Sequence, residues 1–372
     1  MSAEVDVGRV DSVGREGSAG RRDTGTRHTR VRVRVGVRVR VGRMIRLAIR
    51  PGPWKRAPVS TVLALSLGLL LLLHSWIPDR VGGLGSLVET FLPWFGLVVP
   101  VLLARALRRR SAAATVALVL PVAVWLNLFG GLLGDKSHGP GDLTVVSHNV
   151  GADNPDRTGT ARDLAAAGAD VLALEELTPR ASRTYEKELA TAYPYHAVLG
   201  TVGVWSRLPL SDTRAVDTAM DVGPLADRLP AGARAAENRA LRTTVTTDRG
   251  PLAVYVAHLG SVRVLPSSGF STGDRDRGAK ALAKAVAAEP DRRVVLLGDL
   301  NGTTDDREFK GLTSRLRSAQ DTAGDGFGFS WPARFPVARI DQILVRGVRP
   351  TRSWVLPATG SDHLPVAAGI SW

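Results

Sequence analysis

Three long apolar segments lie in the first third of the chain, at residues 58–77, 84–104 and 111–134. The first and third contain no formally charged residue, and the second contains one acidic residue near its start. Each is long enough to cross the hydrocarbon core of a bilayer, which takes about 20 helical residues. Three such segments in succession favour membrane helices over buried helices of a soluble protein. They also disfavour a cleaved signal peptide. The pattern therefore predicts three transmembrane helices over residues 58–134.

The orientation of these helices follows from the positive charges beside them. Residues 1–57 contain 15 Lys/Arg against 5 Asp/Glu, and residues 105–110 read RALRRR. Because loops rich in Lys and Arg stay in the cytoplasm, we expect both segments to be cytoplasmic and everything after residue 134 to be outside the cell. The linker 135–142 reaches at most about 28 Å when extended. The following domain is therefore expected at the outer membrane surface of a multi-pass membrane protein.

The N-terminal arm, residues 1–57, is rich in Gly and Arg. Its run TRVRVRVGVRVRVGR (29–43) alternates Arg and Val, a pattern that would suit a strand only beside an anionic partner. A low-complexity arm of this kind is expected to be disordered. Met44 opens a compact basic segment that leads into the first apolar one, so we consider Met44 as the start of translation, with Met1 as the alternative.

From residue 143 to residue 372 the pattern alternates between strands and helices, which predicts one layered α/β domain. A short turn, TTDRGPL, indicates that part of the sheet is antiparallel. Segments 211–237 and 260–276 are rich in Gly, Pro, Ser and charge, and we expect them to be loops that set substrate choice. The expected strands are 143–148, 170–174, 203–206, 239–247, 251–258, 293–298, 338–345 and 364–372. The expected helices are 157–167, 179–191, 274–288 and 305–317.

Composition excludes several kinds of site. The chain has no cysteine, so it has no disulfide, thiolate zinc site or cysteine nucleophile. It also lacks a GxxxxGK phosphate loop and an HExxH zinc motif. The net charge of +14 lies mostly in the arm, because residues 136–372 contain 29 Lys/Arg against 27 Asp/Glu. The α/β domain is thus close to neutral, without the excess of positive charge that binding to a nucleic-acid backbone usually requires.

Polar side chains recur where the predicted strands end or begin, although each alone is more often a structural cap. The sequence VVLLGDLNG, for example, places a carboxylate and an amide two residues apart at the mouth of a buried strand. Hard divalent cations such as Mg²⁺ prefer oxygen ligands, and hydrolysis of a phosphate ester needs such a cation, an activated water and an oriented histidine. The residues that supply this chemistry are Asn149, Glu175, Glu176, His258, Asp299, Asn301, Asp341, Asp362 and His363.

In this order the residues resemble the motifs of the endonuclease/exonuclease/phosphatase superfamily, over residues 143–372. The resemblance implies a DNase I-like α/β four-layer sandwich, in which two packed mixed sheets are flanked by helices. It implies Mg²⁺ as the cofactor, with Mn²⁺ as the alternative. Glu176 would bind the metal, with Glu175 as the other candidate, and Asn149 and Asp362 would assist.

The resemblance also implies catalytic roles. Asp299 would activate the water beside Asn301, and His363, oriented by Asp341, would contact the scissile phosphate. His258 would stabilise charge on the non-bridging oxygens. Arg239 and Arg263 are weaker candidates for clamping phosphate oxygens, because Arg offers bidentate donors.

Three functions remain open. The leading one is a membrane-anchored, outward-facing, Mg²⁺-dependent phosphohydrolase that acts on a lipid-linked or headgroup phosphate. The apolar segments followed by this domain also resemble actinobacterial membrane proteins of the superfamily that are linked to teicoplanin resistance, which suggests a lipid carrier of the cell wall. The alternatives are a membrane-tethered extracellular nuclease and a non-catalytic binding module.

Overall fold

The computed structural model describes residues 52–80, 82–218, 238–266 and 269–372. Gly52–Trp372 forms one compact unit. Most of the predicted disordered arm and the choice between Met1 and Met44 lie outside the described residues.

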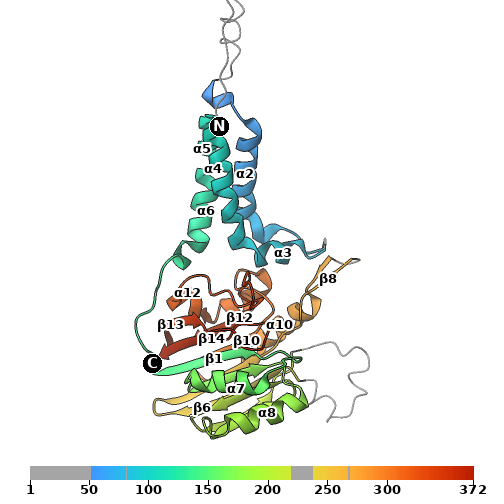
Figure 1. Ribbon diagram of the computed structural model, residues 1–372, viewed down its shortest axis with the longest axis vertical. Helices are drawn as coiled ribbons and strands as arrows, with labels where there is room; N and C mark the ends of the chain where they lie inside the picture. The colour runs from blue at the N-terminus through green and yellow to red at the C-terminus, as the bar shows by residue number, and fades with distance from the viewer. Residues whose placement is uncertain (1–51, 81, 219–237, 267–268) are drawn as a thin grey trace, which may run out of the picture. The chain divides into compact units, whose positions relative to one another are not determined.

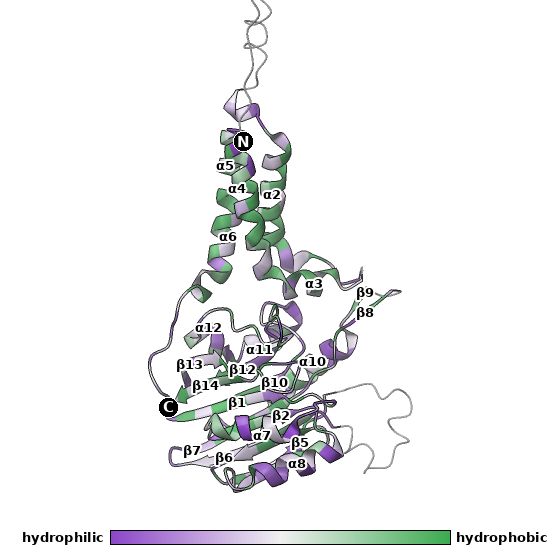
Figure 2. Cartoon of the chain, viewed as in Figure 1, coloured by the Kyte–Doolittle hydropathy of each residue, from purple (hydrophilic) through white to green (hydrophobic). Residues whose placement is uncertain are grey.

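Two helical stretches are long and apolar enough to cross a membrane. The first, Pro58–Trp76, combines helix α2 (Pro58–Leu73) with a 3₁₀ turn. The second, Ala112–Leu132, comprises α5 (Ala112–Ala117), α6 (Val119–Phe129) and a further 3₁₀ turn. Figure 2 shows the hydrophobic colouring of these helices.

The predicted helix 84–104 is broken. Helix α3 (Leu84–Thr90) is followed by the 3₁₀ helix η3 (Leu92–Leu97) and then by α4 (Val98–Arg108), with a bend of 69°. Pro93 sits at the break, where proline supplies no backbone N–H and cannot continue the helix of the preceding turn. The three segments could form a third span only as one bent unit, so a straight third helix is not present.

The remainder of the described chain contains two six-stranded mixed sheets. In each sheet a single pair of neighbouring strands is parallel, β1 with β2 and β7 with β10. The first sheet has the order β13 (Arg349–Val355), β14 (Val366–Ser371), β1 (Leu143–Asn149), β2 (Val171–Glu175), β4 (Val202–Ser206) and β3 (Tyr195–Leu199). The second has the order β11 (Arg317–Ser318), β12 (Asp341–Arg346), β10 (Val294–Asp299), β7 (Gly250–Ala257), β6 (Ala240–Thr247) and β5 (Leu210–Ala215).

The sheets pack face to face and carry helices on their outer faces (Figure 1). Apolar side chains of both sheets, including Val145, Val204 and Val254, form the core between them. Helices α7 (Arg157–Ala166) and α8 (Pro179–Leu189) cover the first sheet, and α10 (Gly273–Ala287) and α11 (Lys310–Thr313) cover the second. This is the expected layered α/β sandwich. The buried strands lack polar alternation because both of their faces are covered.

Several elements differ from the expectation, and strands β3 and β13 and helix α12 (Ala319–Ala323) were not predicted. The predicted helix 305–317 is only the 3₁₀ turn η6 (Arg307–Phe309) followed by the single turn α11. The predicted strand 338–345 begins at Asp341, because residues 338–340 belong to the loop that approaches the site. Among the predicted loops, 211–215 is part of β5, and 260–276 contains a hairpin of β8 (Arg263–Leu265) and β9 (Gly269–Ser271).

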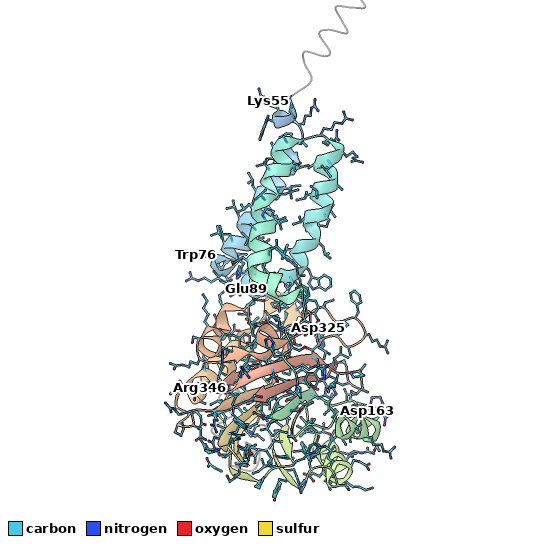
Figure 3. The ribbon with its side chains drawn as sticks, turned by 90° about the vertical axis from the view of Figure 1, so that its left-hand side faces the viewer. Lys55, Trp76, Glu89, Asp163, Asp325 and Arg346 are labelled. Carbon is cyan, nitrogen blue, oxygen red and sulfur yellow. The ribbon has the colours of Figure 1, made fainter. Side chains whose placement is uncertain are left out.

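The helices contact the sandwich through polar and aromatic side chains. Glu89 of α3 is fully buried and lies 3.0 Å from the guanidinium of Arg307. The indole of Trp94 in η3 donates a hydrogen bond to the carbonyl of Val337 and stacks on Phe329. Figure 3 places Glu89 at the end of the helices that meets the sandwich, and Lys55 at the opposite end.

Candidate active site

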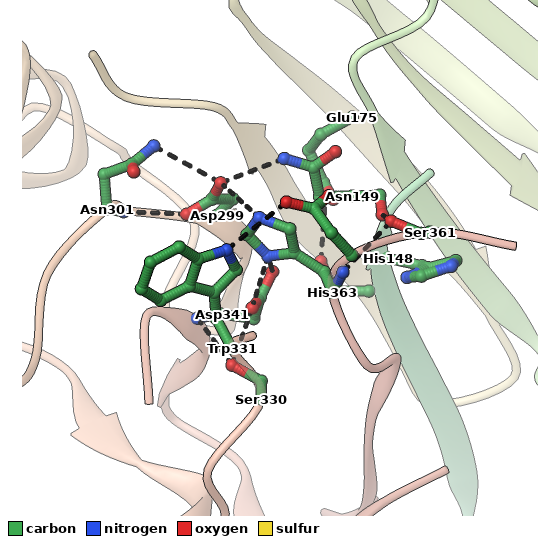
Figure 4. A network of polar contacts seen from close by, with 12 residues as sticks. His148, Asn149, Glu175, Asp299, Asn301, Ser330, Trp331, Asp341, Ser361 and His363 are labelled. Carbon is green, nitrogen blue, oxygen red and sulfur yellow. Dashed lines mark hydrogen bonds and ion pairs between the residues drawn. The ribbon is translucent and has the colours of Figure 1, made fainter. Parts of the chain in front are cut away.

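The sheet topology brings the polar strand ends to one edge of the sandwich. Asn149 ends β1, and Asp299 ends β10, its neighbour in the other sheet. The antiparallel partner of β10 begins at Asp341, which lies directly opposite Asp299 in the register. His363 precedes β14, which pairs with β1. Residues from distant parts of the sequence therefore meet in one polar cluster (Figure 4).

Asn149 links two acids. Its amide nitrogen donates to Glu176 Oε1 at 3.1 Å and to Asp299 Oδ2 at 3.0 Å. Its amide oxygen accepts from the backbone N–H of Gly151. Two neighbouring carboxylates require a donor between them, which explains this orientation of the amide. Asn149 thus positions the acids, and its amide oxygen is already occupied by a backbone donor.

The adjacent acids Glu175 and Glu176 face different environments. Glu175 is fully buried, accepts a hydrogen bond from Ser147 Oγ at 3.0 Å, and has a pKa raised well above its usual value, mainly by burial. Glu176 is partly exposed, and its Oε2 accepts from the backbone of Ala152. Glu176 has a left-handed backbone with φ of 59°, an unusual conformation for Glu, which turns its side chain toward the site. Of the two, Glu176 is the acid that a cation could reach.

Asp299 is held in a fixed orientation. The backbone N–H of Asn301 donates to its Oδ1 at 2.8 Å, and the Asn301 amide lies 3.3 Å from its Oδ2. Burial, reinforced by the charge of Asp341, raises the pKa of Asp299 to about 7. The preceding Gly298 has φ of +147°, and a Cβ there would lie 1.9 Å from the carbonyl oxygen of Ala257. Only glycine fits this close approach of β10 to β7.

His363 is hydrogen-bonded to Asp341. Its Nδ1 lies 2.9 Å from Asp341 Oδ2 and 3.2 Å from Oδ1, while its Nε2 lies 3.8 Å from Asp299 Oδ2. Burial opposes charge on the ring, but the carboxylates of Asp341 and Asp299 outweigh it and raise the pKa of His363 to about 10. The imidazolium can therefore present a proton at Nε2 to an anionic ligand.

His258 is the least satisfied polar group of the cluster. It is buried, and neither ring nitrogen has a hydrogen-bond partner within the described part of the chain. Its Nε2 lies 3.7 Å from both Glu176 and Asp299. Burial, with the charge of Arg239 second, lowers the pKa of His258 to about 4. A buried imidazole whose unpartnered Nε2 faces two acids calls for a further partner, and a phosphate oxygen would serve.

The remaining predicted residues are less central. Arg239 is half-buried and influences His258, as described, whereas Arg263 is exposed on β8 and makes no hydrogen bond or ion pair to the cluster among the described residues. Asp362 is exposed, and its carboxylate lies 3.4 Å from the indole nitrogen of Trp331. It lines a cavity of about 360 Å³ that Glu176 also lines. The structure therefore brings Asp362 to the site and leaves Arg263 outside it.

Sequence reasoning missed three contributors. Ser330 donates to Asp341 Oδ2 at 2.6 Å, and Trp331 lies across the cluster beside Asp341 (Figure 4). His148 is fully buried behind the site, where burial lowers its pKa to about 3. Ser330 and Trp331 follow no predicted strand, so no pattern identified them. His148 directly precedes Asn149, but a lone histidine in an apolar strand carries no functional signal.

The residues present fit a hard divalent cation. Glu176 and Asp362 offer carboxylate oxygens to one cavity, the donor type that Mg²⁺ prefers, with space for water and a phosphate. Oxygen or nitrogen atoms of Asp299, Asp341 and His363 also lie within 4.8 Å of one another. That second group is better described as an ion-paired network, because a protonated His363 cannot ligate a cation.

Comparisons with known proteins agree with this geometry. The sequence model of the "Endonuclease/Exonuclease/phosphatase family" matches residues 146–363. No curated protein sequence matches the chain. Among solved structures, D. rerio TDP2 complexed with a single-strand DNA product is 19% identical with a TM-score of 0.50, and the match covers 61% of this chain and 98% of that one. That likeness concerns the fold.

Two further structures match at lower similarity. The mannosyl-6-phosphatase Bt3783 of Bacteroides thetaiotaomicron is 15% identical with a TM-score of 0.47, over 62% of this chain and all of that one. Beta toxin of Staphylococcus aureus with bound magnesium ions is 18% identical with a TM-score of 0.44, over 61% and 99%. The family match spans more than half of the chain. The chain therefore belongs to the endonuclease/exonuclease/phosphatase family and is a metal-dependent hydrolase of phosphate esters.

Proposed function

We propose that this protein is a membrane-anchored, outward-facing, Mg²⁺-dependent phosphohydrolase that acts on a lipid-linked or headgroup phosphate. The observation that carries the proposal is the buried ion pair between Glu89 of α3 and Arg307 of η6 in the sandwich. Breaking such a pair leaves an uncompensated buried charge, so it resists separation of the helices from the catalytic domain. A hydrolytic site held in this way against membrane helices works at the bilayer surface, where lipid phosphates are concentrated.

Positive charge supports the orientation. Lys55 and the arginines Arg105, Arg108, Arg109 and Arg110 surround the ends of α2, α4 and α5, and Ser111 hydrogen-bonds the backbone of Arg56. Figure 3 places Lys55 at the end of the helices away from the sandwich, and Ser111, which directly follows these arginines, contacts the backbone of Arg56 beside Lys55. The preference of Lys and Arg for the cytoplasmic side then favours an external catalytic domain.

In the proposed mechanism, Glu176 and Asp362 would hold the cation, and Asn149 keeps Glu176 and Asp299 apart and oriented. When bound, the cation would neutralise charge that develops on the phosphate. Asp299, whose raised pKa suits a general base near neutral pH, accepts a proton from the attacking water. Asn301 fixes the carboxylate in position for that transfer.

The two histidines stabilise the phosphate. His363 is protonated and directs Nε2 toward the cluster, so it donates to a phosphate oxygen in a low-dielectric setting. His258 is neutral, and its unpartnered nitrogen offers a second donor without adding charge. Arg239, on the same side as His258, adds a cationic field that favours an anionic ligand.

The test uses the full chain in nanodiscs, supplied with Mg²⁺, vesicles of a long-chain isoprenyl diphosphate and supercoiled plasmid in one tube. Phosphate release without nicking, abolished in Asp299→Ala, is the expected result. Nicking without phosphate release would instead make the protein a tethered nuclease and overturn the lipid assignment. The binding-module alternative is disfavoured because the family is hydrolytic and Asp299 and His363 are both in place.

A further inference from the structure

An apolar pocket lies where the helices meet the catalytic domain, apart from the polar cluster. Its volume is about 390 Å³, and its lining is almost entirely apolar. Two walls belong to the membrane-helix region, around Trp94 of η3 and Trp125 of α6, and the third is formed by Phe327 and Phe329 of the sandwich. The pocket therefore opens between candidate membrane spans and is closed on one side by the enzyme domain.

The polar atoms of its walls are already satisfied. The indole N–H of Trp94 donates to the carbonyl of Val337, and that of Trp125 donates to the carbonyl of Pro93, each at 2.8 Å. Trp94 stacks on Phe329 at 5.5 Å between ring centroids. Walls built in this way offer carbon surface and no free indole donor, so they favour a hydrocarbon chain over a polar ligand.

The loop that carries Phe327 and Phe329 also reaches the catalytic residues. Phe329 is followed directly by Ser330, whose hydroxyl donates to Asp341, and then by Trp331, which contacts Asp362. The backbone N–H of Leu364, next to His363, donates to the carbonyl of Ser330. The polypeptide needs only the five residues 327–331 to pass from the apolar pocket to the polar cluster, since consecutive Cα atoms are about 3.8 Å apart.

We propose that this pocket binds the hydrocarbon chain of a lipid phosphate while its headgroup occupies the site between His258 and His363. The proposal rests on the function proposed above, and it adds the determinant of substrate choice. A chain enters from the bilayer between η3 and α6, passes Phe329, and delivers its phosphate beside Trp331. Soluble phosphate esters use the catalytic cluster without this pocket.

Filling the pocket tests the proposal in the full chain in nanodiscs. Leu126→Trp adds bulk to the pocket wall, and Val119→Trp adds the same bulk to an exposed position of α6 outside it. Leu126→Trp should raise the KM for a long-chain isoprenyl diphosphate about tenfold, with p-nitrophenyl phosphate hydrolysis unchanged, and Val119→Trp should change neither. The pocket proposal would be overturned if both variants raised the KM for the lipid equally, or if Leu126→Trp reduced activity equally on the lipid and the soluble substrate.

A binding measurement separates this proposal from the proposed function. Asp299→Ala in nanodiscs is exposed to a lipid phosphate with a diazirine in its tail, and adducts are mapped by mass spectrometry. The proposal expects adducts at Trp94, Trp125, Phe327 or Phe329 that unlabelled lipid phosphate displaces and the corresponding lipid alcohol does not. Displacement by both alike would mean ordinary boundary lipid, and the pocket proposal would fail. Specific adducts without wild-type hydrolysis would retain the pocket and reject the function, whereas hydrolysis without pocket adducts would do the reverse.

Discussion

His363 Nδ1 lies 2.9 Å from Asp341 Oδ2, and the same oxygen accepts a hydrogen bond from Ser330 at 2.6 Å. The carboxylate is thus fixed on one side by a hydroxyl and orients the imidazole on the other. This arrangement keeps a proton at Nε2, the nitrogen that faces Asp299.

Replacement of Asp341 by Asn should therefore cost activity far more than stability of the site. We expect kcat to fall about 10²- to 10⁴-fold, because His363 loses both its charge partner and its orientation. Ser330→Ala removes only the hydroxyl behind Asp341 and should cost about 5- to 10-fold. Steady-state kinetics over a pH series would measure both. If the two variants lose equal activity, the orientation of His363 depends on the hydroxyl of Ser330 rather than on the charge of Asp341.

Activity should depend on pH with a rising and a falling limb. Asp299 acts as a carboxylate, so activity rises as the pH passes through its pKa of about 7. A bound cation favours the charged carboxylate and would shift this rise to lower pH. His363 acts as an imidazolium, whose pKa is raised to about 10, so activity falls as pH rises through that value. Profiles of kcat/KM with a soluble phosphate ester test this. In Asp341→Asn, the falling limb should move from about pH 10 toward the ordinary pKa of histidine. That shift would assign the falling limb to His363.

Glu176 and Glu175 should differ in their effect on the cation. Glu176→Gln removes a charge that faces the cavity, and the affinity for Mg²⁺ should fall at least roughly tenfold. Glu175→Gln is the matched control, because burial raises the pKa of that acid and disfavours its charged form beside Ser147, and the neutral amide has the same shape. Titration calorimetry with Mg²⁺ measures both variants. A loss of affinity in Glu175→Gln alone would exchange the roles of the two acids.

Arg307→Ala should destabilise the junction between helices and catalytic domain. Glu89 is fully buried, so the loss of its guanidinium partner should lower the free energy of unfolding by about 3 kcal/mol. Thermal unfolding in detergent would show a lower midpoint. Adding Glu89→Gln to the same chain should recover part of the loss, because the uncompensated charge is then gone. An unchanged midpoint in Arg307→Ala would mean that the ion pair does not hold the two parts together.

The strands that carry the site were predictable because their apolar runs are buried on both faces. The runs before Asn149, Glu175 and Asp299 each read as a strand, and each strand ends within one residue of the expected point. Weaker strands were missed where the pattern is polar or short, as in β5 and the β8–β9 hairpin. Their residues are half-buried or exposed, so burial imposed no hydrophobic signature on them.

The chain's own sequence thus determined the apolar helices, the α/β class and the inventory of acids, amides and histidines, because each depends on local pattern or residue type. Tertiary structure alone decided which of these groups meet. The resemblance already implied Glu176 before Glu175, but the exposure of Glu176 depends on one left-handed residue, and the support of Asp341 by Ser330 depends on a loop that crosses between elements. Likewise, the aromatic pocket beside Pro93 arises from packing of helices against Phe327 and Phe329, contacts between residues more than two hundred positions apart.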